Sequence, residues 1–443
     1  MPFIANTDQQ REEMLREIGM SAADLFADVP AELKCAPPNL PAGMSEQEVG
    51  ALLRALSERN HTHLTSFLGG GLYDHYIPAA VGELVGRSEF YTAYTPYQPE
   101  LSQGTLQAIY EFQSCICRLT DMEVSNASLY DGGTAMYEAV TMALRVTGRD
   151  RVIVDDTVSP IYRTILRSYT SNLGIELIET HSTEGIANRA EIIRHMNDST
   201  AAVVVQTPNF FGCIEDFTDL ATIAHSRGAL LVVSCYPIAL GLIKTPGAMG
   251  ADIVTGEGQS LGLPLSFGGP YLGFMATRMK YVRKMPGRIA GRTVDRLGRD
   301  GFVLTLQARE QHIRREKATS NICTNEGLCA LTSLVYMSLL GKTGLQKLAR
   351  LCADKAWYAQ QKLLSIPGVR LHFPRHWYFN EFVLELPTHV DRVIRELLHH
   401  GISAGFPLVR YYPKMTNALL VAVTEKRTKK EIDFFAHVLE NAL

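Results

Sequence analysis

The sequence predicts an α/β protein in which a mostly parallel sheet domain precedes a small α+β domain. Between about residues 86 and 277, short β-branched runs alternate with amphipathic segments, the pattern of strands joined by crossover helices. Shorter strands and helices return after residue 365 or so and predict the second domain. The chain of 443 residues is long enough for roughly two to three domains.

The predicted organisation has three parts. Residues 1–78 are expected to form an N-terminal arm with a polar helix, the proline-rich stretch 35–41 and a helix that Ser45 and Glu48 open as a capping box. The large α/β domain is predicted over residues 79–320. A helical connector and the small C-terminal α+β domain are predicted over residues 321–443.

The individual elements follow from periodicity. Predicted strands of the large domain are the β-branched runs 151–155, 175–179, 201–206, 229–234 and 252–256. Helices 134–146 and 217–226 end at Gly148 and Gly228, as glycine commonly ends helices. After a basic segment at 278–317, the predicted order is helices at about 325–340 and 345–365, strands at 369–373, 381–386 and 418–423, and helices at 390–400 and 429–442.

Composition excludes several classes of function. The chain is 46% hydrophobic and 20% charged with a net charge of −3, so it is globular and has no general attraction for nucleic acid or anionic membranes. Its eight cysteines show no disulfide spacing. Residues 1–19 lack an apolar signal stretch, and the apolar stretch 328–340 is too short to span a bilayer. We expect a cytoplasmic protein without membrane contact.

A glycine-rich turn, YDGGTA at 130–135, precedes the first strongly amphipathic helix. Free N–H groups and the helix dipole at such a position can hold a phosphate. Many α/β proteins have glycines there for steric reasons only, so the turn by itself leaves both interpretations open.

The order of elements after this turn resembles the large domain of pyridoxal-phosphate enzymes of the aspartate-aminotransferase fold. The resemblance rests on a strand ending at Thr207, a helix, the buried strand 230–234 and the segment 250–255. Such enzymes need an acid beside the pyridine nitrogen and a lysine for the Schiff base. Here Ser234 and Gln259 stand at those positions, and Lys244 and Lys280 lie elsewhere. The resemblance therefore implies the fold without its Schiff-base lysine.

Longer segments resemble the P-protein of the glycine cleavage system, a glycine dehydrogenase (decarboxylating). They are FYTAYTPYQPELSQG at 90–104, REQHIRREKATSNIC at 309–323, and the shorter matches at 126–129, 256–264 and 267–274. All belong to the N-terminal half of that family, which also lacks the lysine. In many bacteria the protein is divided between two chains, and a chain of this length resembles subunit 1, the alpha subunit. The resemblance implies a beta partner that carries pyridoxal 5'-phosphate, with glycine decarboxylated and its aminomethyl group transferred to the lipoyl arm of the H-protein.

Two segments supply the candidate active-site or interface residues. The first is the loop 94–104, in which two prolines impose an extended path lined with polar groups. The second is the basic run 309–317, which offers cations for binding an anion or for pairing at an interface. A rigid surface loop and a solvated helix face are the simpler interpretations. The candidates are Tyr94, Tyr97, Gln98, Glu100, Ser102, Gln103, Arg309, His312 and Arg315.

We expect no metal site and no catalytic residue in this chain alone. Cys115 and Cys117 face different sides of a helix, and the His61/His63 and His399/His400 pairs lack companion ligands at helical spacing. Two alternatives remain. The chain could be an autonomous pyridoxal-phosphate lyase with an unusual lysine such as Lys317, or a scaffold that only binds the H-protein.

Overall fold

The structure is a computed structural model that describes residues 5–36, 39–92 and 94–443. The chain forms two compact units, Met1–Thr62 and His63–Leu443. The first contains α1 (Asp8–Ile18) and α2 (Glu46–Glu58), each opened by a capping box, and the short 3₁₀ helices η1 (Asp24–Phe26) and η2 (Ala31–Leu33). None of these four described helices has a buried residue.

A seven-stranded sheet in the order β2-β8-β7-β6-β5-β3-β4 forms the centre of the second unit. Five neighbouring strands are parallel, and β8 is antiparallel to both β7 and β2. The bounds are β2 (Val124–Ser125), β3 (Arg151–Asp155), β4 (Glu176–Thr180), β5 (Thr200–Thr207), β6 (Leu230–Cys235), β7 (Ile253–Glu257) and β8 (Gly273–Thr277). The predicted strands all appear in this sheet, within a residue or two at each end.

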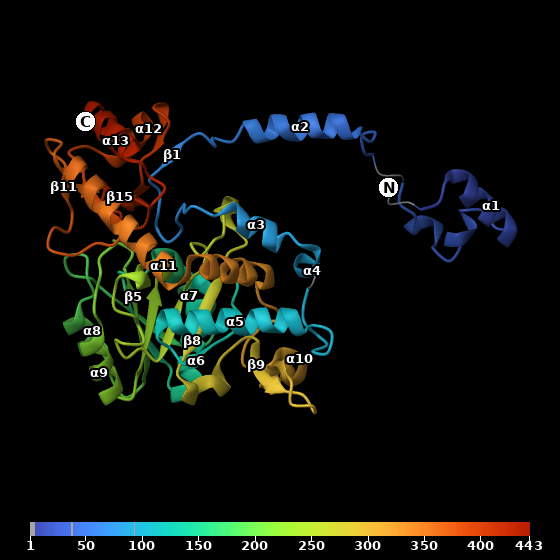
Figure 1. The fold of residues 1–443 in the computed structure, drawn as a ribbon, viewed down its shortest axis with the longest axis horizontal. Helices are drawn as coiled ribbons and strands as arrows, with labels where there is room; N and C mark the ends of the chain where they lie inside the picture. The colour runs from blue at the N-terminus through green and yellow to red at the C-terminus, as the bar shows by residue number, and fades with distance from the viewer. Residues whose placement is uncertain (1–4, 37–38, 93) are drawn as a thin grey trace. The chain divides into compact units, whose positions relative to one another are not determined.

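Helices cover both faces of this sheet (Figure 1). Alternate strand residues point to opposite faces. Val152 therefore packs with α6 (Gly132–Thr147) and α7 (Pro160–Thr170), whereas Ile153 lies in the core beneath α5 (Gln103–Thr120) and α9 (Thr218–Ser226). The remaining helices of this region are α3 (Ala79–Val85), α4 (Ser88–Tyr91) and α8 (Arg189–His195).

The basic segment after β8 contains a hairpin that the sequence pattern did not predict. Strands β9 (Ile289–Val294) and β10 (Asp300–Thr305) pair antiparallel. Gln113 of α5 holds the hairpin: its amide donates to the carbonyl of Ala290 and accepts the N–H of Ala290, both at 2.9 Å. The chain continues through α10 (Gln311–Arg314). The 3₁₀ helices of the unit are η3 (Pro237–Gly241), η4 (Ser266–Gly268), η5 (Met279–Lys284), η6 (Gln307–Arg309), η7 (Arg315–Lys317) and η8 (Leu408–Arg410).

Helix α11 (Gly327–Leu364) extends from α5 toward the C-terminal helices (Figure 1). Gly341 has φ +58 and breaks its helical geometry, so the halves correspond to the two long helices predicted from the sequence. By length and composition alone α11 could cross a membrane. However, Leu334 and Tyr336 are buried in the core of the large sheet, and Ala359 and Leu363 in the C-terminal core. Helix α11 therefore contributes to both hydrophobic cores.

The C-terminal part is a four-stranded sheet in the order β11-β12-β15-β14 with two helices. Its strands are antiparallel, and a separate core joins them to the end of α11. A second short pairing, β1 with β13, brings the segment after Thr62 against this part. The bounds are β1 (Thr65–Ser66), β11 (Arg370–Leu371), β12 (Glu381–Glu385), β13 (Ile402–Ser403), β14 (Phe406–Pro407), β15 (Ala418–Ala422), α12 (Val390–His399) and α13 (Lys429–Ala442).

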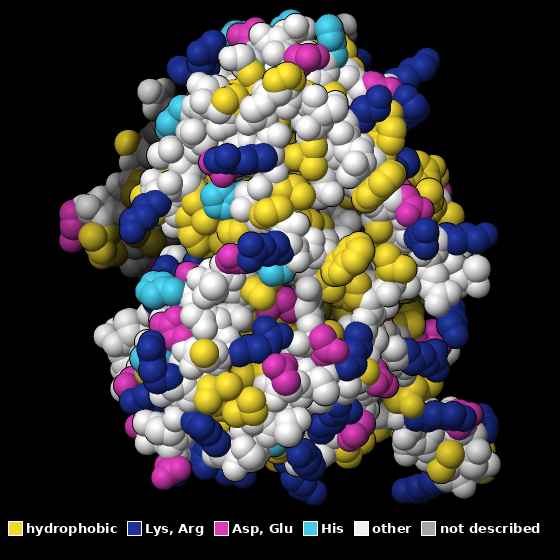
Figure 2. Space-filling view, turned by 90° about the vertical axis from the view of Figure 1, so that its left-hand side faces the viewer, with side chains coloured by type: hydrophobic (Ala, Val, Ile, Leu, Met, Phe, Trp, Pro, Cys, Tyr) yellow, Lys and Arg dark blue, Asp and Glu magenta, His cyan; other side chains and the backbone are white. Residues whose placement is uncertain are grey.

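Charged side chains of both signs are mixed over the face in Figure 2. Lysine and arginine lie among aspartate and glutamate there, without a broad surface of one sign. This face matches the small net charge of −3 and offers no basic surface of the kind that binds nucleic acid.

Candidate active-site region

A carboxylate of the chain itself occupies the N-terminus of α6, where the glycine turn could hold a phosphate. The N–H of Gly132 donates to Oε2 of Glu257 at 2.9 Å. Asp131 caps the helix, and its Oδ1 accepts the N–H of Thr134 at 2.7 Å. The negative charge that a helix N-terminus attracts is therefore supplied from within the fold.

Glu257 is the last residue of β7 and is buried. Its Oε1 also accepts the N–H groups of Gln259 at 2.9 Å and Leu272 at 3.0 Å. Burial raises the pKa of Glu257 to about 7, against the lowering effect of these N–H donors. The space beside Gly132 is closed, because an added Cβ there would lie only 2.4 Å from the hydroxyl of Tyr162.

Gln259, at the expected lysine position, is tied to the backbone of Tyr73. Its Oε1 accepts the Tyr73 N–H at 3.0 Å, and its Nε2 donates to the carbonyls of Tyr73 at 3.1 Å and Leu263 at 2.8 Å. Only 1% of Gln259 is exposed. The amide is thus used to hold the segment around Tyr73 against the sheet.

Ser234 is buried near the end of β6 and is followed by Cys235 and Tyr236. Burial raises the pKa of the Cys235 thiol well above its ordinary value. Neither Ser234 nor Cys235 can act as an anionic partner of a pyridinium nitrogen. The ring of Tyr73 packs 4.4 Å from that of Tyr236, centroid to centroid.

These residues do not fit pyridoxal phosphate. The phosphate position holds the Glu257 carboxylate, the lysine position holds a glutamine bonded to backbone, and the acid position holds a serine. A covalently held pyridoxal group needs the lysine, and the other two functions orient the group and tune its electronics.

A buried cluster that sequence spacing did not reveal lies beside Tyr236. His75 Nδ1 is 2.6 Å from Glu425 Oε2, and Cys352 Sγ donates to the same oxygen at 3.5 Å. The other ring nitrogen of His75 contacts the Tyr236 hydroxyl. The ligand atoms of His75, Cys352 and Glu425 lie within 4.8 Å of one another, so these three residues could hold a metal ion. In the structure, His75 and Cys352 are each connected to Glu425 by a hydrogen bond.

Glu381 of β12 binds the segment around Tyr73, which Gln259 also holds. Its Oε1 accepts the Gly70 N–H at 2.6 Å, and its Oε2 accepts the Tyr73 hydroxyl at 2.8 Å. Burial raises the pKa of Glu381 from 4.5 to about 7, and both hydrogen bonds oppose this rise. Since the unfolded chain loses this proton near pH 4.5 and the folded chain near pH 7, this group favours unfolding increasingly across that interval.

We therefore expect Glu381→Gln to flatten the pH dependence of stability. The pKa difference between about 7 and 4.5 corresponds to about 3 kcal/mol, which the wild type loses between pH 4.5 and 7 relative to the variant. Urea unfolding at pH 5, 6, 7 and 8 measures this loss. Glu385→Gln on the same strand is the control, because hydrogen bonding by Arg370 lowers the pKa of Glu385. Equal pH profiles of wild type and Glu381→Gln would refute the assignment.

The predicted loop lies mostly on the surface. Tyr94 and Tyr97 are 74% and 71% exposed, Gln98 and Glu100 are exposed, and Ser102 is half-buried. Gln103 ties the end of the loop to β10, because its amide donates to the Phe302 carbonyl and accepts the Phe302 N–H, both at 2.8 Å.

The basic run is divided among η6, α10 and η7. Arg309 is half-buried and donates to the carbonyls of Leu306 and Gly287, each at 2.8 Å. Its Nη1 is buried without a partner among the described residues, and burial lowers the pKa of Arg309. His312 and Arg315 are exposed, and Arg315 adopts φ +54.

The two segments meet in one cleft of about 520 Å³, which we name the Arg288 cleft. It brings Tyr97 and His312 together, whereas Gln98, Glu100, Ser102 and Arg315 do not line it. Arg288 and Glu310 were not predicted, since no motif marks a residue whose role depends on tertiary burial. The lining residues are Thr95, Tyr97, Arg288, Leu304, Gln307, Glu310, Gln311, His312, Ile322 and Cys323.

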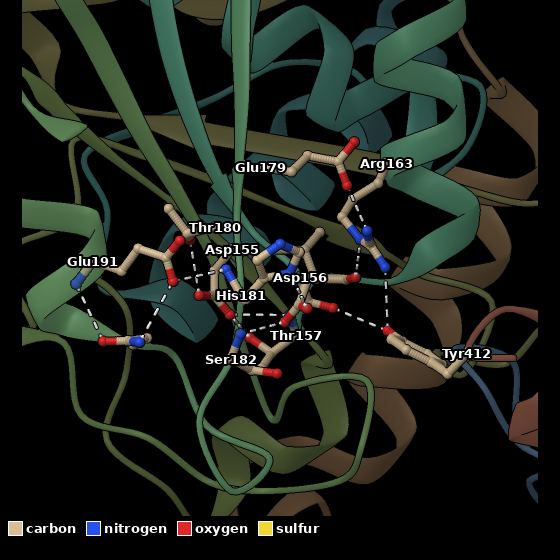
Figure 3. A network of polar contacts seen from close by, with 12 residues as sticks. Asp155, Asp156, Thr157, Arg163, Glu179, Thr180, His181, Ser182, Glu191 and Tyr412 are labelled. Atoms are coloured by element: carbon tan, nitrogen blue, oxygen red, sulfur yellow. Dashed lines mark hydrogen bonds and ion pairs between the residues drawn. The ribbon is translucent and has the colours of Figure 1, made fainter. Parts of the chain in front are cut away.

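A separate polar network occupies the carboxyl ends of β3 and β4 (Figure 3). The Asp155 carboxylate accepts hydrogen bonds from Thr157 and Thr180. Arg163 reaches both Glu179, at 2.5 Å, and the Tyr412 hydroxyl, at 3.2 Å. These bonds join the segment around Tyr412 to the large sheet.

Comparisons with known proteins agree with this architecture. A family model described as the glycine cleavage system P-protein matches residues 1–439. The chain is 57% identical to a "Probable glycine dehydrogenase (decarboxylating) subunit 1" of Geotalea uraniireducens, over 100% of both chains. The protein of the same description from Nitratidesulfovibrio vulgaris (Hildenborough) is 52% identical, also over 100% of both.

Solved structures give the same result for the fold. The crystal structure of glycine decarboxylase (P-protein) of the glycine cleavage system, in inhibitor-bound form, has a TM-score of 0.93 and 44% identity over 100% of both chains. The sphingosine-1-phosphate lyase of Burkholderia pseudomallei has a TM-score of 0.68 and 16% identity over 94% of each chain, a likeness of fold alone. The predicted pyridoxal-phosphate enzyme fold is confirmed.

Proposed function

Because the chain belongs to the glycine cleavage system P-protein family, we propose that it is the alpha subunit of a two-chain glycine dehydrogenase (decarboxylating). With its beta partner it decarboxylates glycine and transfers the aminomethyl group to the lipoyl arm of the H-protein. The relatives described as subunit 1 match this chain from end to end, which supports a division of the enzyme between two chains. The complex works in the cytoplasm.

One observation supports the assignment of the cofactor to the other subunit. The position that would take the cofactor phosphate is filled by Glu257, whose carboxylate accepts the N–H of Gly132 at 2.9 Å. With Gln259 in place of lysine, this chain has no Schiff-base anchor for pyridoxal phosphate at that position. We therefore place the cofactor on the beta subunit, where it acts as electron sink for the glycine carbanion.

The contribution of this chain is then a binding face. In a paired assembly of this fold the site lies near the subunit interface, and the exposed loop with Tyr94, Tyr97 and Glu100 supplies polar groups to it. Gln103 fixes the end of this loop to β10. We propose that the polar loop and the Arg288 cleft face the beta subunit.

Reconstitution tests this function. The isolated chain with added pyridoxal phosphate, glycine and lipoylated H-protein is expected to release no carbon dioxide from carboxyl-labelled glycine. Addition of the beta subunit is expected to give release that saturates with the concentration of this chain. Beta subunit alone serves as the control. Release by the isolated chain would support an autonomous lyase, and an inactive mixture that still binds H-protein would support a scaffold.

A further inference from the structure

Arg288 is a buried cation without an anionic partner. It directly precedes β9 and is 9% exposed. Its Nη1 donates to two neutral hydroxyls, Thr324 Oγ1 at 3.1 Å and Thr95 Oγ1 at 3.4 Å. Within the described part of the chain, no carboxylate forms an ion pair with Arg288. A buried charge is costly unless it is paired, so this guanidinium is suited to an anion that enters the cleft.

Glu310 lines the same cleft, and no hydrogen-bond donor among the described residues is paired with its carboxylate. Its side chain is 10% exposed, and its Oε1 is buried without a hydrogen-bond partner among residues 5–36, 39–92 and 94–443. The other carboxylate oxygen lies 3.6 Å from Nδ1 of the exposed His312, and the Glu310 charge also acts on the neighbouring Arg309 guanidinium, with which no hydrogen bond is formed in the described part of the chain. The Glu310 carboxylate is therefore suited to a ligand that carries N–H donors.

We infer that the Arg288 cleft binds a small zwitterion, with its carboxylate on Arg288 and its ammonium group on Glu310. A dianion such as phosphate would satisfy Arg288 but would be repelled by Glu310. This inference rests on the proposed function, under which the zwitterion is glycine. The cleft volume of about 520 Å³ is larger than the volume of a glycine molecule. It therefore leaves room for groups of the beta subunit that would cover the bound glycine.

Steady-state decarboxylation by the assembled complex tests this site. Arg288→Gln is expected to raise the KM for glycine roughly 10- to 100-fold, because it removes a charged hydrogen-bonding partner, while the KM for H-protein stays unchanged. Arg288→Lys keeps the charge and is expected to show a smaller increase. Arg292→Gln is the matched control, since Arg292 lies on β9 and pairs with Asp300 in solvent. Circular dichroism and sedimentation check folding and assembly, and Arg288→Lys carries the test if Arg288→Gln fails to fold.

Two half-molecules of glycine separate binding from a structural role. Acetate is expected to compete with glycine in the wild type and to lose at least about tenfold in potency in Arg288→Gln. Methylammonium is expected to lose potency in Glu310→Gln instead. Loss of both inhibitors in both variants, or of neither, would overturn the inference. An inactive wild-type complex would refute the proposed function itself, whereas an active one in which Arg288→Gln matches Arg292→Gln would refute this inference alone.

Discussion

Deletion of Met1–Thr62 is expected to weaken association with the beta subunit at least about 100-fold while His63–Leu443 stays folded. The unit exposes an apolar stripe on α2, where Val49, Leu52, Leu53 and Leu56 are 39–58% exposed at helical spacing. Burial of such side chains contributes about 1 kcal/mol or more for each, and each 1.4 kcal/mol changes a dissociation constant tenfold. We therefore expect these side chains to contribute to association with the partner chain.

The measurement is sedimentation of the two chains mixed over a range of concentrations. The double substitution of Leu52 and Leu56 by serine is expected to reproduce most of the loss. Substitution of Arg54 and Glu58 by serine on the same helix provides the control and should leave binding within a few-fold of wild type. A deleted chain that binds as tightly as the full chain would exclude the unit from the interface.

Gly212→Ala is expected to have the largest effect on stability. Gly212 adopts φ +85, and a Cβ there would lie 1.9 Å from the backbone carbonyl oxygen of Glu381. Overpacking against backbone costs about 1–3 kcal/mol, and the left-handed conformation costs an alanine a further 1–2 kcal/mol or so. Together they correspond to a fall in melting temperature on the order of 10 °C, or to insoluble protein.

Gly298→Ala is the matched comparison. Gly298 has φ +76, but a Cβ there would meet no atom within 4 Å. Only the conformational cost remains, so the melting temperature is expected to fall by a few degrees. Thermal unfolding followed by circular dichroism compares both variants with the wild type. Equal, small shifts in the two variants would show that the contact between Gly212 and β12 is not close.

The five parallel strands of the sheet could be predicted because they read as β-branched runs, most of them buried, whereas the antiparallel β2 and β8 were not predicted. β3 and β5 are the clearest cases, with Val152, Ile153 and Val203 all fully buried. The β9–β10 hairpin was not predicted, since its outer half is exposed and polar, and its position depends on the hydrogen bonds of Gln113. The division at residues 78 and 320 stays a prediction.

The candidate site was only partly accessible from the sequence. Strand order placed Ser234 in β6 and Gln259 just after β7, where the structure has them. The role of Glu257 as acceptor at the N-terminus of α6 could not be derived from the sequence, because its contact with Gly132 joins residues 125 positions apart. Likewise, nothing in the sequence distinguishes Arg288 from the exposed arginines around it, since the difference is burial. The roles assigned to Glu100 and Arg315 remain predictions.

We expect the cofactor to be held covalently by the partner and not by this chain. Borohydride reduction of the active complex, followed by peptide mapping of both chains, tests it most directly. The expected result is one pyridoxyl-lysine on the beta subunit and none here, also in a complex that carries Gln259→Lys, because Glu257 still fills the phosphate position. A pyridoxyl-lysine on any peptide of the wild-type alpha subunit would show that this chain also holds the cofactor.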